Sequence, residues 1–300
     1  MSDGPDTHWQ RVLWKKQDFP DNYVPSSFLS SLRTNANYRP HTYWALVCAS
    51  YPVTQHLASV FNFLAVFILL RKRNLDPRLL VWLSVLAFLL GYLTLEVLDR
   101  RFTDSASRYS RRAKAVKSSI LVFLALLSLS PVLRTLTAAT SSDSIWALSA
   151  CLFVLNCLLA DYTSIDRSRA SRERLTSVLS MNAAISSSVV LASRLADDLS
   201  VFALILFSVQ SFTLFPLLRR RLQSGPKVIT TLFTVCLIGS TITLTAPLSS
   251  IIVTLYIVIF TFVTFIAPGI LMWAQKFKNE LRGTWDPAVP KVNSVAVNNS

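Results

Sequence analysis

The chain has little charge, few glycines and few cysteines. Asp, Glu, Lys and Arg make up 15% of its 300 residues, whereas a soluble domain carries about 25%. None of the six glycines forms a GxxxG pair, and none of the four cysteines belongs to a CxxC pair. A disulfide framework and a zinc site of local spacing are therefore not expected, and the cysteines are interpreted as small buried apolar side chains.

The chain also lacks the local motifs of an autonomous sugar transferase. It has no DxD pair, no glycine-rich phosphate loop and no G-x-S-x-G elbow, and its three histidines are scattered. Apart from Asp99 and Asp161 at span ends, Glu96 is the only carboxylate inside an apolar stretch. We therefore expect no catalytic residue, no cofactor and no metal site in this chain.

What the chain does have is apolar residues gathered in long blocks. Hydrophobic residues make up 52%, and the blocks cover residues 47–70, 79–98, 118–137, 145–163, 176–194, 199–218, 228–248 and 250–273. Blocks of about 20 residues match the ~30 Å hydrocarbon core of a bilayer. The pattern predicts an all-α polytopic membrane bundle with about eight transmembrane helices, with Pro247 in the turn between the last two.

Three parts of the chain follow from these blocks. Residues 1–43 are expected to form a cytosolic head next to the membrane, residues 44–274 the transmembrane helical domain, and residues 275–300 a cytosolic tail. Of the 30 basic residues, 24 lie in the head, the tail and the loops that share their side of the membrane. The positive-inside rule then places both termini in the cytosol. The net charge of +14 indicates contact with anionic lipid and not with nucleic acid.

Loop 71–78 is an exception to the charge rule, because it contains four basic residues on the opposite side. Two interpretations remain open. The loop is either a tolerated exception between two full spans, or the first two blocks form a re-entrant hairpin. Pro52, Gln55 and His56 interrupt the first block and make the hairpin conceivable.

Polar residues inside the blocks are costly in lipid and therefore mark either packing or function. They are Gln55, His56, Asn156, Asn182 and Gln210. One interpretation is hydrogen bonding between helices, which would hold the bundle together. The other is a polar path through the membrane, as in a transporter or lipid scramblase.

A second polar group is expected on the lumenal side. Arg134 and Arg194 lie near lumenal span ends, and with Asp143 and Asn182 they form a candidate intramembrane polar cluster linking spans three to six. Arg194 and Asp198 are four residues apart and could pair locally. The alternative is that both arginines extend independently to the membrane surface.

Four segments resemble one known family. They are WQRVLWKKQDFPDNYVPSSFL (residues 9–29), SPVLRTLTAATSSDSIWALS (residues 130–149), MNAAISSSVVLASRL (residues 181–195) and GTWDPA (residues 283–288). Their order and spacing resemble the phosphatidylinositol glycan class C family, a subunit family of the phosphatidylinositol N-acetylglucosaminyltransferase complex, over nearly the whole chain. Loops 71–78 and 99–117 do not match a family pattern.

The resemblance implies a non-catalytic membrane subunit in the endoplasmic reticulum. The complex transfers N-acetylglucosamine from UDP-GlcNAc to phosphatidylinositol, the first step of GPI-anchor biosynthesis, and another subunit holds the transferase domain. The implied partners are the catalytic and accessory subunits, with phosphatidylinositol and anionic lipid. Because the head and tail are motif-rich but too polar to span, we expect partner contacts at Trp9, Trp14, Phe19, Pro20, Asp21, Asn22, Tyr23, Trp285 and Asp286.

Overall fold

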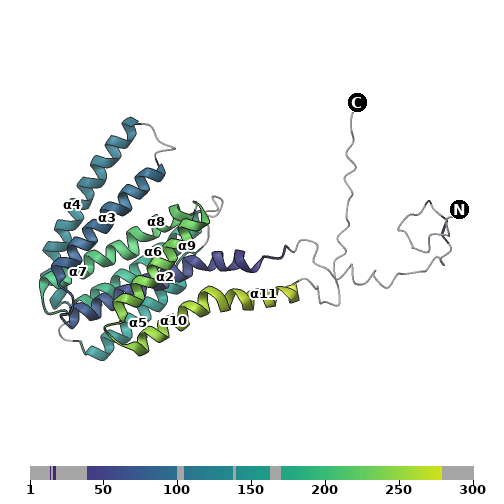
Figure 1. Cartoon of the computed structure of the whole chain (residues 1–300). Coiled ribbons are helices and arrows are strands. Elements are labelled where there is room, and N and C mark those ends of the chain that lie inside the picture. Colours follow the sequence, from purple (N-terminus) through teal and green to yellow (C-terminus); the bar gives the residue numbers. More distant parts are fainter. Residues whose placement is uncertain are drawn as a thin grey trace. The chain divides into compact units, whose positions relative to one another are not determined.

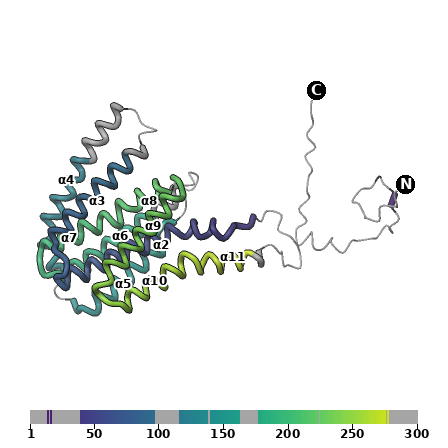
Figure 2. The backbone as a smooth tube through the Cα atoms, viewed as in Figure 1, coloured from purple at the N-terminus to yellow at the C-terminus, as the bar shows by residue number. Residues whose placement is uncertain are grey.

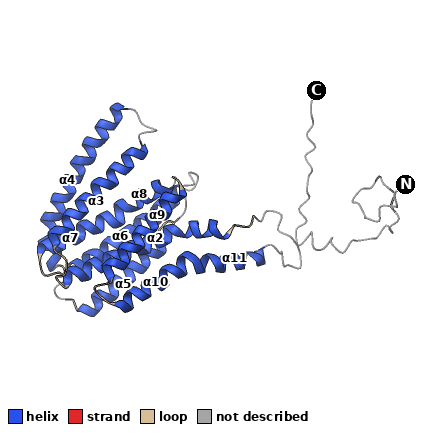
Figure 3. Cartoon of the chain, in the orientation of Figure 1, coloured by secondary structure: helices blue, strands red, loops and turns tan. Residues whose placement is uncertain are grey.

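A computed structural model describes residues 39–99, 105–137, 140–162, 170–223 and 225–278, together with Trp14, Lys16 and Gln17. These ranges are helical apart from short connections and hold no strand (Figure 3). The elements in chain order are α2 (Tyr43–Arg71), α3 (Pro77–Asp99), α4 (Ser105–Thr135), α5 (Ser142–Leu159), α6 (Ala170–Ala192), α7 (Asp198–Val209), the π-helical turn η2 (Gln210–Leu214), α8 (Phe215–Gln223), α9 (Lys227–Thr245), α10 (Ser250–Thr261), the π-helical turn η3 (Phe262–Ile266) and α11 (Ala267–Lys278).

The chain divides into two compact units. The larger unit, Trp44–Pro268, is the helical bundle, and the smaller one joins residues up to Tyr43 with residues from Gly269 onward. In the smaller unit, the His41 backbone N–H donates to Oε1 of Gln275 at 2.8 Å. The bundle contains every site described below.

Each of the eight predicted apolar blocks coincides with helix in the described ranges, which confirms the helical membrane bundle (Figure 1). Within the described residues, seven helical segments are long and apolar enough to cross a membrane. The fifth block lies in α6, which has 23 residues and whose described apolar part is Ser177–Ala192. Pro247 lies in the turn between α9 and α10, as predicted.

The first two blocks form two separate helices of full length. α2 has 29 residues and α3 has an apolar stretch of 20 residues, so each is long enough to span alone. Arg73, with φ of 59°, turns the chain between them. The guanidinium of Arg71 lies 5.6 Å from the ring centre of Trp146 in α5, so this basic residue of the exceptional loop has an aromatic partner. These lengths favour two full spans over a re-entrant hairpin.

α2 is the central helix of the bundle. Buried residues make up 72% of its apolar window, whereas only 6% of the window in α4 is buried. Figure 2 shows α2, in purple, running among green segments that come from much later in the sequence. Its Phe63 ring lies 5.6 Å from Phe153 of α5 and 5.5 Å from Phe212 of η2. Because most of this helix is enclosed by protein, its buried polar side chains need protein partners.

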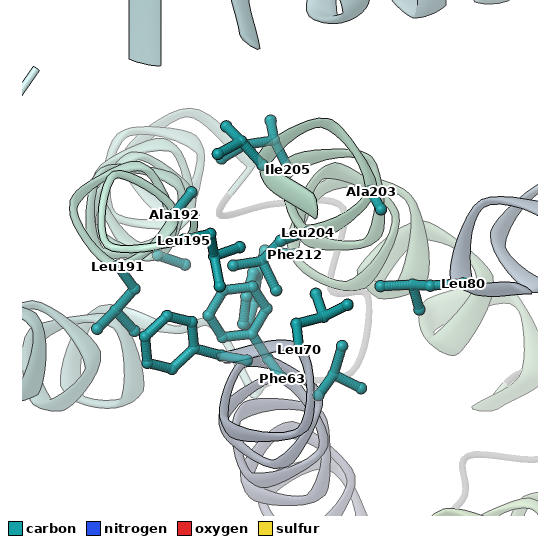
Figure 4. Packing of buried hydrophobic residues seen from close by; sticks show 14 of the residues in the cluster. Phe63, Leu70, Leu80, Leu191, Ala192, Leu195, Ala203, Leu204, Ile205 and Phe212 are labelled. Atoms are coloured by element: carbon teal, nitrogen blue, oxygen red, sulfur yellow. The ribbon is translucent and has the colours of Figure 1, made fainter. Parts of the chain in front are cut away.

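The apolar core joins α2 to α6 and α7. Figure 4 shows Phe63 and Leu70 of α2 pointing toward Leu191 of α6, Leu204 of α7 and Phe212 of η2. α7 also packs against α3 and α4, and α5 packs along α6. The core therefore fixes the helices whose polar residues meet in the next section.

Two π-helical turns interrupt the long helices that contain them, and such turns often mark functional or packing sites. At η2, Gln210 faces the backbone of α3. In the amide orientation that satisfies both groups, its nitrogen donates to the Ser84 carbonyl at 3.0 Å and its oxygen accepts from the Phe88 N–H at 3.1 Å. At η3, the Thr264 hydroxyl lies 3.0 Å from the Thr54 hydroxyl of α2. Each turn thus presents a polar side chain to a neighbouring helix.

Candidate functional site: a buried polar network around α2

The network starts from polar side chains in an otherwise apolar helix. Thr54, Gln55, His56, Ser59 and Asn62 of α2 are all buried. At 3.6 residues per turn, these five positions point in several directions around the helix axis. Because other helices surround α2, each direction meets a different neighbour.

His56, Asn156 and Ser180 form the first junction, which joins α2, α5 and α6. The Asn156 amide nitrogen donates to the carbonyl and to the hydroxyl of Ser180, at 2.8 and 2.9 Å. Its oxygen, Oδ1, lies 2.7 Å from Nε2 of His56. Since Oδ1 can only accept, Nε2 of His56 holds the hydrogen and donates. This assignment fixes the imidazole tautomer at the junction.

A second set of bonds joins α2 to α9. Nε2 of Gln55 donates to the Thr234 hydroxyl at 2.8 Å, and Nδ2 of Asn62 donates to the Ser240 hydroxyl at 3.0 Å. The Thr234 hydroxyl in turn donates a hydrogen bond to the Thr230 carbonyl at 2.8 Å. Interhelical bonds of this kind contribute about 0.6–2 kcal/mol each in a membrane.

Arg219 of α8 forms the third junction, at the end of the bundle where α2 begins. Its side chain is buried, with 4% exposed. It donates to the Pro52 carbonyl at 3.1 Å and to the Asp161 carbonyl at 3.3 Å. The Asp161 carboxylate pairs instead with Arg220 at 3.1 Å. The Arg219 charge is thus held by backbone oxygens, which costs less than leaving a buried cation without acceptors.

Tyr162 links the first and third junctions. Its ring centre lies 5.7 Å from that of His56, edge to face, and 5.9 Å from the Arg219 guanidinium. Its hydroxyl donates to the Cys157 carbonyl at 2.8 Å. Burial raises the pKa of this hydroxyl above its ordinary value, so the hydroxyl stays protonated and keeps donating.

The arrangement orders helices and holds a cation in place. Its hydrogen bonds connect α2, α5, α6, α8 and α9. Oε1 of Gln55, Oδ1 of Asn62 and Nε of Arg219 are buried without a hydrogen-bond partner among the described residues. In the described part of the chain, no three His, Cys, Asp or Glu side chains lie close enough to share a metal ion.

The predicted polar path does not form a single line of residues. Gln55 forms a hydrogen bond with α9, and Gln210 forms hydrogen bonds with α3. His56 and Asn156 form a hydrogen bond with each other. Asn182 lies exposed on the outer side of α6. Four of the five residues therefore join neighbouring helices, as the packing interpretation expects.

Two of the four residues in the predicted lumenal cluster lie in one polar group. Arg134 pairs with Asp198 at 3.0 Å and donates to the Ala196 carbonyl at 3.4 Å. Arg194 donates to the carbonyls of Thr137, at 3.2 Å, and Thr140. These contacts tie the end of α4 to the connection between α6 and α7.

The other two residues of that prediction lie elsewhere. Asn182 is on the outer side of α6, ten residues before the helix end. Asp143 is exposed in the first turn of α5 and has no hydrogen bond or ion pair with any described residue. The local Arg194–Asp198 pair is also wrong, because the carboxylate of Asp198 faces Arg134 across the two helices.

The predicted partner contacts fall mostly outside the described residues. These are Trp9, Phe19, Pro20, Asp21, Asn22, Tyr23, Trp285 and Asp286. Trp14 is described, and 86% of its side chain is exposed. An exposed tryptophan is compatible with a contact surface, and its role stays a prediction.

Sequence reasoning missed Arg219 and Tyr162. Arg219 opens a run of three arginines after an apolar block, a pattern typical of a loop that sets topology. One feature of the sequence could have pointed to this region. Asp161 lies at the end of an apolar block, on the same side of the membrane as the arginine run, so an ion pair between them could have been expected. Ser180 was missed because a serine in a serine-rich helix gives no individual signal.

The fold and the network together define a polytopic helical membrane protein whose buried polar residues fasten one helix to another. Comparison with known sequences makes this specific. The GPI2 family profile, described as phosphatidylinositol N-acetylglucosaminyltransferase, matches residues 9–286. The chain belongs to this family.

Similar proteins come from yeasts and from mammals. The phosphatidylinositol N-acetylglucosaminyltransferase GPI2 subunit of Schizosaccharomyces pombe is 39% identical over 285 residues, covering 95% of this chain and 87% of that protein. The C subunit of phosphatidylinositol N-acetylglucosaminyltransferase is 33% identical in Mus musculus, covering 96% and 95%, and 33% identical in Homo sapiens, covering 93% and 92%. No solved structure matches the chain.

Proposed function

We propose that this chain is a non-catalytic membrane subunit of the complex that transfers N-acetylglucosamine from UDP-GlcNAc to phosphatidylinositol. This transfer is the first step of GPI-anchor biosynthesis. Family membership over residues 9–286 and relatives named as subunits of that transferase support the assignment. The non-catalytic role rests on the chemistry of the bundle.

The observation that supports a scaffold role best is the bonding of Asn156. This one amide is bonded to His56 of α2 and, through both the backbone and the side chain, to Ser180 of α6. A general base or nucleophile needs a polar group directed at a substrate. A group bonded on all sides by neighbouring helices instead holds those helices in register.

The subunit lies in the endoplasmic reticulum membrane with both termini in the cytosol. The distribution of basic residues supports this orientation, since 24 of 30 belong to one side. In this orientation Arg219 and Tyr162 lie near the cytosolic leaflet. The basic loops there contact phosphatidylinositol and other anionic lipids, at about 1 kcal/mol for each basic residue near the surface.

The polar head and tail hold the other subunits against the membrane. The candidate contact segments are Trp9–Leu29 in the head and Gly283–Ala288 in the tail. Aromatic residues on polar segments are typical of protein interfaces, because they supply a large contact area at low entropic cost.

Affinity purification in mild detergent tests this function directly. The tagged chain is expected to recover the other subunits and transferase activity, and the purified chain alone is expected to form no N-acetylglucosaminyl-phosphatidylinositol. Replacing residues 9–29 or 283–288 with a Gly/Ser linker should reduce recovery of the other subunits. Product formed by the isolated chain would contradict the non-catalytic role, and unchanged recovery would contradict the assigned contacts.

A further inference from the structure

The outer side of α6 has an unusual composition for a surface that meets lipid. Four residues on this side are exposed, namely Val178, Leu179, Asn182 and Ser186. Leu179, Asn182 and Ser186 follow at spacings of three and four, so they form one stripe along the helix. We call these three residues the α6 outer stripe.

Asn182 has no hydrogen bond with any residue that the structure describes, and neither does Ser186. The inner serines of the same helix behave differently. Ser180, Ser187 and Ser188 donate to Asn156, Ser149 and Ala184, at 3.0 Å or less. These inward-facing serines of α6 thus have hydrogen-bond partners, whereas the outward-facing side chains of Asn182 and Ser186 have none among the described residues.

The position of Asn182 places its amide within the hydrocarbon region. α6 runs from Ala170 to Ala192, and Asn182 lies about 12 Å along the helix from Arg174, the last charged residue near its start, and about 15 Å from its end. Acyl chains offer neither donors nor acceptors, so an amide exposed there is costly.

We propose that the α6 outer stripe is the docking face for a transmembrane helix of another subunit, which bonds the Asn182 amide through an Asn, Gln, Ser or Thr side chain at the same depth. This inference rests on the proposed function, because a member of a membrane complex has membrane-embedded neighbours. The amide supplies two donors and one acceptor, and the small Ser186 lets a second backbone approach closely.

Substitution of the stripe tests the proposal in the full-length chain. Asn182→Leu with Ser186→Ala removes the polar groups and keeps an apolar surface, so the chain alone should melt at the wild-type temperature. Recovery of at least one membrane-spanning subunit should fall roughly three- to thirty-fold. Thr254→Val is the matched control, because Thr254 is an exposed hydroxyl of α10 that bonds its own helix at the Ser250 carbonyl. The control should leave recovery unchanged.

The outcomes separate this inference from the proposed function. If the wild-type chain recovers no other subunit, the proposed function is wrong. If the wild type recovers the subunits and the stripe variant recovers them equally, the docking face is wrong.

If the stripe variant melts at a lower temperature than the wild type, reduced recovery could reflect misfolding. Crosslinking from a photoreactive amino acid at position 182 then tests the docking face independently. In native membranes the photoreactive group should form an adduct with one membrane-spanning subunit, identified by mass spectrometry, while the same group at position 254 should not. Adducts with lipid alone, or with a second copy of this chain, would overturn the proposal.

Discussion

Nε2 of His56 donates to Oδ1 of Asn156 across 2.7 Å, and this bond joins two helices whose residues are 100 positions apart. The same asparagine is bonded to Ser180, so one side-chain amide determines how α2, α5 and α6 meet. The tautomer of His56 follows from this contact, since the oxygen of an amide only accepts.

Asn156→Leu is expected to lower the free energy of unfolding by about 2–3 kcal/mol, because it leaves the His56 N–H without an acceptor and removes the amide that donates to the carbonyl and hydroxyl oxygens of Ser180. His56→Leu should act partly through the same bond. Thermal unfolding of both single variants and the double variant in mild detergent measures the coupling, expected at about 1 kcal/mol. Additive effects of the two substitutions would show that the bond contributes nothing.

Arg219→Lys should destabilise the bundle by about 1–3 kcal/mol although the charge is kept. A lysine ammonium lacks the planar fork with which Arg219 reaches the Pro52 and Asp161 carbonyls. Arg221→Lys is the matched control, since Arg221 is exposed on the same helix. Equal melting temperatures for the two variants would rule out a special role for the buried guanidinium.

The Tyr162 hydroxyl gives stability a dependence on alkaline pH. Because its pKa is raised in the folded state, its contribution is complete below the unfolded value of about 10 and is lost as pH increases above it. Melting temperatures of the wild type should therefore fall more steeply above about pH 10 than those of Tyr162→Phe. Parallel curves would mean that Tyr162 titrates as it does in the unfolded chain.

Gln210→Leu should loosen α3 while leaving the rest of the bundle in place. The Gln210 amide bonds the backbone of α3 at Ser84 and Phe88, and leucine cannot replace either bond. Amide hydrogen exchange around residues 84–88 should accelerate several-fold, with exchange in α5 unchanged. Thr243→Val, on the exposed side of α9, should not alter exchange in α3.

Hydropathy was sufficient to locate the helices. The first block, predicted at residues 47–70, is α2 at Tyr43–Arg71, because apolar length is set by the bilayer. It could not locate the interruption at η2, since one wider turn changes the direction of Gln210 without changing composition. The sequence also could not show that Arg219 is buried, because α8 continues the helix beyond the apolar run.

Partner choice among the polar residues depends on tertiary packing. The sequence identified Gln55, His56 and Asn156 as candidates for interhelical bonding, and local spacing alone could not pair them. Asn182 was grouped with Arg134 and Arg194 by membrane side, but the direction of a side chain depends on how its helix is rotated. The core of α2, α6 and α7 sets that rotation and turns Asn182 outward.

The central position of α2 has a consequence for biogenesis. α2 is made before the helices that surround it, yet Gln55 finds its acceptor 179 residues later and Thr54 finds its partner 210 residues later. Until those segments leave the ribosome, several polar side chains of α2 have no native partner in the membrane. During early insertion, the translocation machinery must therefore supply temporary hydrogen-bonding partners for these side chains. Chains truncated before η3 should be substrates for membrane quality control.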